Sequence, residues 1–161
     1  MKKRILIAIT LCATCLVLLV GCASSATPAD DEQTKNRQYM ASVNQIMEKI
    51  DTQMVDFSTA VKGGEVISLS SQLTSVSENV DALKALTVPD AMKDTHALYV
   101  KGAEELQTTL KLYVQLYQDV AAPASGSFDY STYASRLDEV KVHYDAGIQA
   151  LKDADTKVSE A

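Results

Sequence analysis

The sequence predicts an all-α protein, an up-down-up-down antiparallel four-helix bundle. Four segments carry apolar residues alternately three and four positions apart, a spacing that places them on one face of a helix. Short turn-forming stretches separate the segments, and short connections force successive helices to run antiparallel. No stretch of useful length alternates apolar and polar residues as a half-buried strand does.

The first predicted helix carries an apolar stripe at residues 40–61, and Gly63-Gly64 ends the helix, because glycine is common just past a helix C-terminus. Its apolar stripe consists of Met40, Val43, Met47, Ile50, Met54, Phe57 and Val61. The second predicted helix covers residues 69–86, with the stripe Leu69, Leu73, Val76, Val80, Leu83 and Leu86. Its many serines are mediocre helix formers, so a three-helix core with a loose second helix is the alternative fold.

Thr87-Val88-Pro89-Asp90 ends the second helix and begins the third, with Pro89 placed in the first turn, where no hydrogen-bonded N–H is needed. The third stripe consists of Tyr99, Ala103, Leu106, Leu110, Tyr113, Tyr117 and Val120. Residues 122–127 are expected to form a loop. The fourth stripe consists of Tyr133, Leu137, Val140, Tyr144, Gly147 and Leu151, with Ile148 beside it. Together the helices form one domain at residues 32–158.

The first residues of the chain have the three parts of a secretory signal peptide. Lys2, Lys3 and Arg4 precede an apolar run at residues 5–20, which ends in Leu19-Val20-Gly21-Cys22. At sixteen residues the run is shorter than the ~20 that a spanning helix needs. An uncleaved transmembrane anchor is therefore the less favoured alternative.

The segment Leu19-Val20-Gly21-Cys22 resembles the lipobox of bacterial lipoproteins. The resemblance implies that signal peptidase II removes residues 1–21 and that Cys22 carries a diacylglycerol and further acyl chains such as palmitate. Small and polar residues at 22–31 then form a flexible tether. The protein is expected on the extracytoplasmic face of the cell membrane or the outer membrane, held there by its lipid.

Cysteine content and charge narrow the possible partners. Cys12 and Cys15 have C-x-x-C spacing but lie inside the signal segment, so the mature protein has no disulfide. The chain has 15 basic and 21 acidic residues, and loss of Lys2, Lys3 and Arg4 leaves 12 basic residues and a formal charge of −9. No basic cluster remains for nucleic acid or anionic lipid.

No catalytic motif is present, so the sequence predicts a protein that is not an enzyme. It has no G-x-S-x-G motif, no Gly-rich phosphate loop and no Glu-x-x-His pair of the di-iron bundles. We expect a bundle that binds a partner protein or a small ligand at the cell envelope. The alternative from another class is a structural or assembly lipoprotein that caps a larger envelope complex.

A second alternative uses Met47 and His143, which fall at similar heights on the antiparallel first and fourth helices. The pair resembles the axial ligands of cytochrome b562-type bundles, and this resemblance implies haem b as cofactor. The same two residue types also suit a site for copper or another metal ion. In the simpler interpretation, His143 pairs with Glu139 one turn earlier and the methionines fill the core. His96 is expected to be a partly buried residue at the end of the core.

Tyrosine is unusually common on the predicted helix faces. The five tyrosines on the third and fourth stripes are Tyr99, Tyr113, Tyr117, Tyr133 and Tyr144. A buried tyrosine needs a partner for its hydroxyl, so the rings either pack inward with their hydroxyls at the rim or line a ligand-binding cleft between the third and fourth helices. In the second case the loop Pro123-Ala124-Ser125-Gly126 would gate one end of the cleft.

Overall fold

The structure, a computed structural model, describes residues 28–63, 67–123 and 126–159. The predicted signal peptide and Cys22 lie outside these residues. The helices are α1 (Pro28–Gly63), α2 (Ser70–Lys84), α3 (Lys93–Ala121) and α4 (Tyr133–Ser159), with short 3-10 helices η1 (Asp90–Met92) and η2 (Tyr130–Thr132) before α3 and α4. Every regular element among the described residues is helical.

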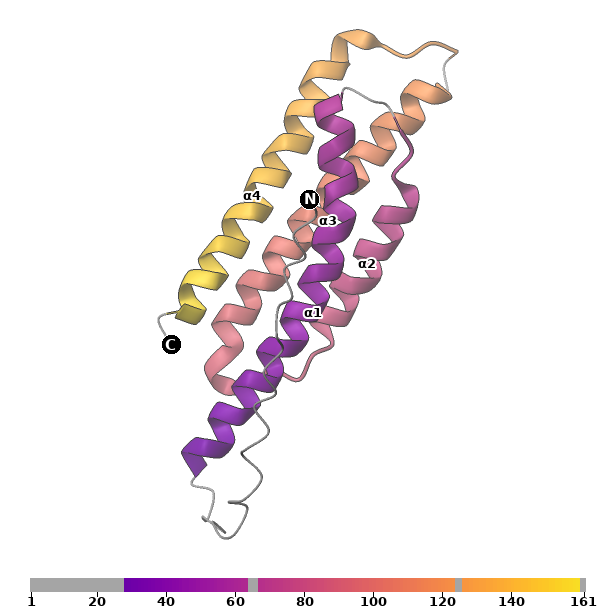
Figure 1. Ribbon diagram of the computed structural model, residues 1–161. Coiled ribbons are helices and arrows are strands. Elements are labelled where there is room, and N and C mark those ends of the chain that lie inside the picture. Colours follow the sequence, from indigo (N-terminus) through magenta and orange to yellow (C-terminus); the bar gives the residue numbers. More distant parts are fainter. Residues whose placement is uncertain (1–27, 64–66, 124–125, 160–161) are drawn as a thin grey trace, which may run out of the picture.

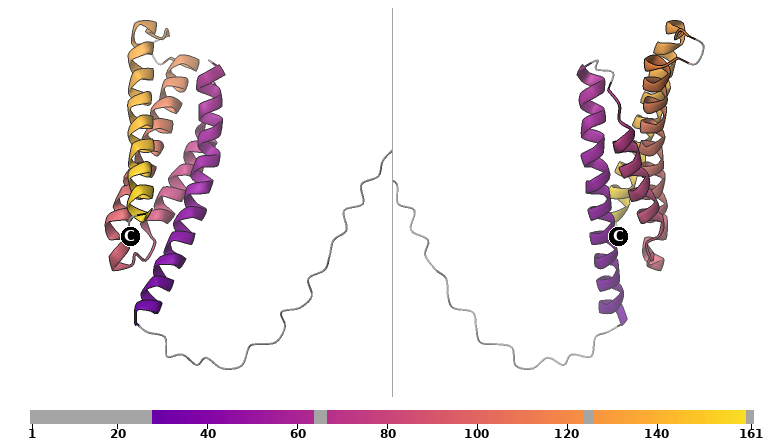
Figure 2. Two further views of the ribbon diagram at one scale, coloured as in Figure 1. Left: turned by 60° about the vertical axis from the view of Figure 1, so that its left-hand side comes forward. Right: turned by 90° about the vertical axis from the view of Figure 1, so that its right-hand side faces the viewer.

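The four helices alternate in direction and pack side by side, which confirms the predicted bundle (Figure 1). The pairs α1–α2, α2–α3 and α3–α4 are in contact, and the α3–α4 pair is the most extensive. The two views in Figure 2 show that α1 stands apart from the α3–α4 pair and that its N-terminal end projects beyond the other helices. The bundle is therefore closed on three sides and looser between α1 and α4.

The helix ends agree with the sequence in one place and differ in two. Gly63 ends α1 as expected. However, α1 begins at Pro28, so the last four residues of the expected tether at 22–31 are helical. The backbone of Pro89 is extended, with φ −60° and ψ 147°. Its carbonyl oxygen accepts a hydrogen bond from the Met92 N–H at 2.9 Å. Pro89 therefore precedes the first turn instead of lying in it.

The serine-rich α2 is a full member of the core. Its residues Val76, Val80 and Leu83 are completely buried, as is Leu69 just before the helix. The hydroxyl of Ser77 donates to the carbonyl of Leu73 at 2.7 Å, so the polar side chain is satisfied within the helix. Packing of one apolar face outweighs the weak helix propensity of the serines, and the alternative with a loose second helix is wrong.

Four of the seven residues of the predicted α1 stripe are buried as expected, and the other three are not. Within the stripe, Met40 and Met47 are half-buried and Val61 is 46% exposed. The residues directly before these three are buried instead: Tyr39, Ile46 and Ala60. The difference follows from the neighbours of α1, because α2 covers one flank of the helix while the flank toward α4 is left partly open.

The core face of α4 is made of small residues where it meets α3. A Cβ on Gly102 of α3 would lie 2.6 Å from Leu151 Cδ2, and one on Gly147 of α4 would lie 3.0 Å from Leu106 Cγ. The two glycines thus allow the helix backbones to approach closely. The larger members of the fourth stripe are only half-buried: Tyr133, Leu137, Tyr144 and Leu151.

Candidate functional site

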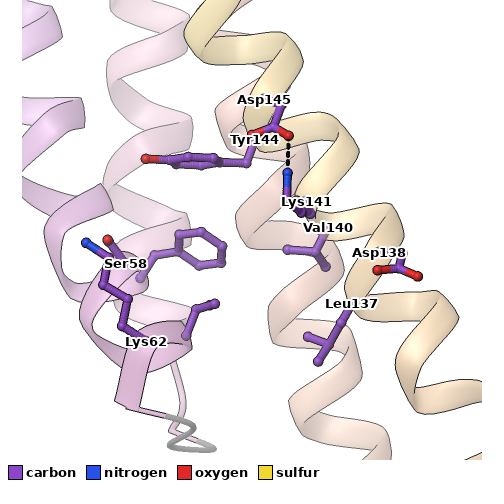
Figure 3. A pocket seen from close by; sticks show the side chains of 10 residues that line it. Ser58, Lys62, Leu137, Asp138, Val140, Lys141, Tyr144 and Asp145 are labelled. Carbon is purple, nitrogen blue, oxygen red and sulfur yellow. Dashed lines mark hydrogen bonds and ion pairs between the residues drawn. The ribbon is translucent and has the colours of Figure 1, made fainter.

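An apolar groove runs between the C-terminal part of α1 and the N-terminal part of α4, with a volume of about 410 Å³ (Figure 3). Its lining residues from α1 are Phe57, Ser58, Val61 and Lys62. Those from α4 are Leu137, Asp138, Val140, Lys141, Tyr144 and Asp145. The spacing of three and four residues within each set places each set along one side of its helix.

Aromatic rings form the inner end of the groove. The ring of Phe57 lies 5.7 Å from that of Tyr144 across the groove, and 5.5 Å from that of Tyr113, which it meets edge to face. Phe57 and Tyr113 are buried, whereas Tyr144 is half-buried. These contacts hold three rings from α1, α3 and α4 in fixed positions, so the groove has a rigid aromatic wall.

Polar groups are confined to the rims of the groove. On the α4 rim, Lys141 is ion-paired with Asp145 one turn later. On the α1 rim, Ser58 and Lys62 are likewise one turn apart. A groove with apolar walls and a few polar groups at its edges is suited to binding a molecule that is largely apolar.

The structure distributes the five candidate tyrosines along the bundle instead of gathering them in one cleft. The Tyr99 hydroxyl donates to Asp155 Oδ1 at 2.6 Å near the other end of α4. Tyr133 packs against Phe128 in the α3–α4 connection, with ring centroids 6.4 Å apart. Only Tyr144 lines the groove, and Phe57 links it to Tyr113; Tyr117 is half-buried on α3. The groove therefore lies between α1 and α4, whereas the predicted cleft was between the third and fourth helices.

The candidate haem ligands Met47 and His143 are both half-buried. His143 Nδ1 lies 2.7 Å from Glu105 Oε2 on α3, so the expected pairing with Glu139 is wrong. The fourth helix carries His143 on the side toward α3, and Glu105 is the carboxylate within reach there. Met47–His143 ligation of haem b or copper stays a prediction.

A second group of polar side chains connects three helices near the N-terminal half of α1. Tyr39 on α1 and His96 on α3 share a hydrogen bond of 2.9 Å between Oη and Nδ1. Burial raises the pKa of Tyr39 to about 12 and lowers the pKa of His96. Burial and the Asp155 carboxylate also raise the pKa of Tyr99. His96 is part-buried, as the sequence predicted.

The described residues contain no group of three or more His, Cys, Asp or Glu side chains placed to hold a metal ion. Among the same residues, no helix has the length and apolar character required to cross a membrane. The chain matches no family model, no curated protein and no solved structure.

Sequence reasoning gave no role to five of the groove residues: Ser58, Lys62, Asp138, Lys141 and Asp145. Phe57, Val61, Leu137 and Val140 were recognised, but only as core positions. The available signal was the pair Phe57 and Val61, one turn apart at the end of the first stripe. That pair could not reveal which neighbouring helix would leave it partly uncovered.

Proposed function

We propose that this chain is a lipid-anchored, extracytoplasmic binding protein without enzymatic activity, and that the groove between α1 and α4 takes a small, largely apolar ligand. The observation that supports the proposal is the groove itself. It combines apolar walls, a rigid aromatic end and a volume of about 410 Å³. Pockets that bind small molecules have volumes of roughly 300–1,000 Å³, so the groove suits a ligand near the small end of that range.

A small ligand fits this surface better than a large protein partner. A stable protein interface takes about 800 Å² from each partner and has a contiguous apolar centre. The exposed large apolar residues outside the groove are spread over four different parts of the fold: Val55 on α1, Ile67 before α2, Tyr130 in η2 and Val142 on α4. Such scattered residues are ordinary on a protein surface.

The proposed address rests on the resemblance of residues 19–22 to a lipobox. A diacylated Cys22 would attach the chain firmly, since each buried methylene contributes ~0.8 kcal/mol. Because α1 rises about 1.5 Å per residue, roughly 44 Å of helix separates Pro28 from Phe57. The attached end of the chain and the groove would then lie at opposite ends of α1, with the groove away from the bilayer.

The first experiment measures binding of the uncharged fluorescent probe 1-N-phenylnaphthylamine to the mature domain. Val61 lines the groove and is 46% exposed, so Val61→Glu introduces a charge at the groove without disturbing the core. Val55→Glu is the matched control, because Val55 lies on the same helix, is 56% exposed and does not line the groove.

We expect the wild type and Val55→Glu to bind the probe alike and Val61→Glu to bind it at least about tenfold more weakly, the effect of a charge in an apolar site. Circular dichroism of both variants would verify that they remain folded. Equal binding by all three proteins, or none by the wild type, would contradict the proposal.

A further inference from the structure

We infer that the ligand of the groove is an anionic amphiphile, an apolar body that ends in a single carboxylate. This inference rests on the proposed function of the groove and specifies the chemical class of its ligand. It is carried by the two polar side chains on the α1 rim, Ser58 and Lys62, which lie one helical turn apart.

The hydroxyl of Ser58 is not used within the fold. On the same helix, the hydroxyls of Thr52 and Thr59 each donate to the carbonyl four residues earlier, at 2.9 Å. Ser58 forms no such bond among the described residues, although it lies directly before Thr59 and is half-buried at the groove. Its O–H is therefore available as a donor to a bound molecule.

The ammonium of Lys62 is also available. Lys62 is exposed near the end of α1 and has no ion pair with any of the described residues. Lys141 across the groove differs, because Asp145 holds it (Figure 3). The two rims are thus unequal: the charges on the α4 rim compensate each other, whereas the α1 rim keeps a positive charge.

The acidic residues of the groove do not cancel this charge. Asp145 is occupied by Lys141, and Figure 3 shows Asp138 on the α4 ribbon, farther from α1 than Leu137 and Val140. One ammonium and one hydroxyl supply donors for the two oxygens of a single carboxylate. The two negative charges of a phosphate would exceed the single positive charge of the α1 rim, and Asp138 and Asp145 lie nearby as further negative charges. The arrangement therefore favours a monoanionic headgroup, with the apolar body against the aromatic wall.

Three probes of equal chain length test the inference, each measured by displacement of 1-N-phenylnaphthylamine near pH 7.5: decanoate, decan-1-ol and decylamine. Decan-1-ol reports the apolar groove alone, and decanoate adds the carboxylate. We expect decanoate to bind the wild type about fivefold more tightly than decan-1-ol, and decylamine to bind more weakly than either.

Lys62→Met and Ser58→Ala should each remove most of the preference for decanoate, because each should weaken the binding of decanoate more than that of decan-1-ol. The control is Lys49→Met, an exposed lysine of α1 that does not line the groove. If decanoate and decan-1-ol bound the wild type equally, or if Lys62→Met kept the preference, the inference of a carboxylate would be overturned. Failure of all three probes to bind would overturn the proposed function itself.

Discussion

At the scale of single residues, the polar contacts inside the bundle are satisfied pairs that link helices distant in sequence. Tyr39 and His96 join α1 to α3, and Tyr99 and Asp155 join α3 to α4. Because these side chains are partly buried, a change in the charge of any one of them acts on the stability of the whole fold. His96 is the member of this group whose charge changes nearest to neutral pH.

His96 should make the protein less stable in mild acid. Burial lowers its pKa in the folded state below the usual 6.5, so the unfolded chain binds the proton more readily. The stabilising contribution is complete above about pH 6.5 and is lost as the pH falls from there through the folded-state pKa. Urea unfolding at about pH 7.5 and pH 5 should therefore give a lower unfolding free energy at the lower pH.

His96→Gln removes the titrating group and retains a side chain able to hydrogen-bond with Tyr39. This variant should lose less stability than the wild type over the same pH interval, and His143→Gln provides the comparison for the other histidine. Asp90 and Asp129, whose pKa values are lowered by hydrogen bonds, titrate below this interval. An unchanged pH dependence in His96→Gln would show that His96 does not destabilise the folded state in acid.

At the scale of helices, the sequence predicts the elements well, but at three positions of the α1 stripe it does not predict which of two adjacent residues is buried. The two rows Tyr39, Ile46, Ala60 and Met40, Met47, Val61 are adjacent on the helix and both apolar. Neighbouring positions are about 100° apart, so the pattern allows either row to face the core. The choice depends on which flank α2 covers, and that is a tertiary contact without a local signal.

The same limit applies to the groove. The stripes on the first and fourth segments identify Phe57, Val61, Leu137 and Tyr144 as apolar positions, but not as residues that face each other across an opening. On its other side α4 packs closely on α3, where Gly102 and Gly147 bring the two helix backbones together. A glycine in a helix pattern indicates close approach to some neighbour, and the sequence does not identify that neighbour.

A pair of substitutions tests which of two adjacent residues of α1 faces the core. Ala60 is 1% exposed and Val61 is 46% exposed. Ala60→Glu should bury a charge and lower the unfolding free energy by about 2–4 kcal/mol. Val61→Glu should change it by no more than about 0.5 kcal/mol. Thermal and urea unfolding of both variants would measure the difference. A larger loss of unfolding free energy in Val61→Glu than in Ala60→Glu would show that Val61 faces the core, as the predicted stripe has it.

At the scale of the whole molecule, α1 connects the proposed anchor to the proposed site. It is 36 residues long, compared with 15 for α2, and its N-terminal end extends past the other helices (Figures 1 and 2). The exposed side chains of residues 31–35 are mostly polar or charged, including the ion pair of Lys35 with Asp31. A helix that is polar on all sides suits a solvent-exposed spacer, so α1 would act as a rigid continuation of the tether.

The lipid anchor itself is tested by Cys22→Ser in cells supplied with labelled palmitate. The serine hydroxyl cannot replace the thiol that the diacylglycerol modifies in this class, so the variant should carry no label and keep residues 1–21. Because it would lack the acyl chains, the extracted variant should also shift toward the aqueous phase in a detergent partition. Cys15→Ser is the matched control, since Cys15 lies within the segment proposed to be removed, and this variant should be labelled and processed like the wild type. Labelling and cleavage of Cys22→Ser would refute the lipoprotein assignment, while the bundle and its groove would stand on their own measurements.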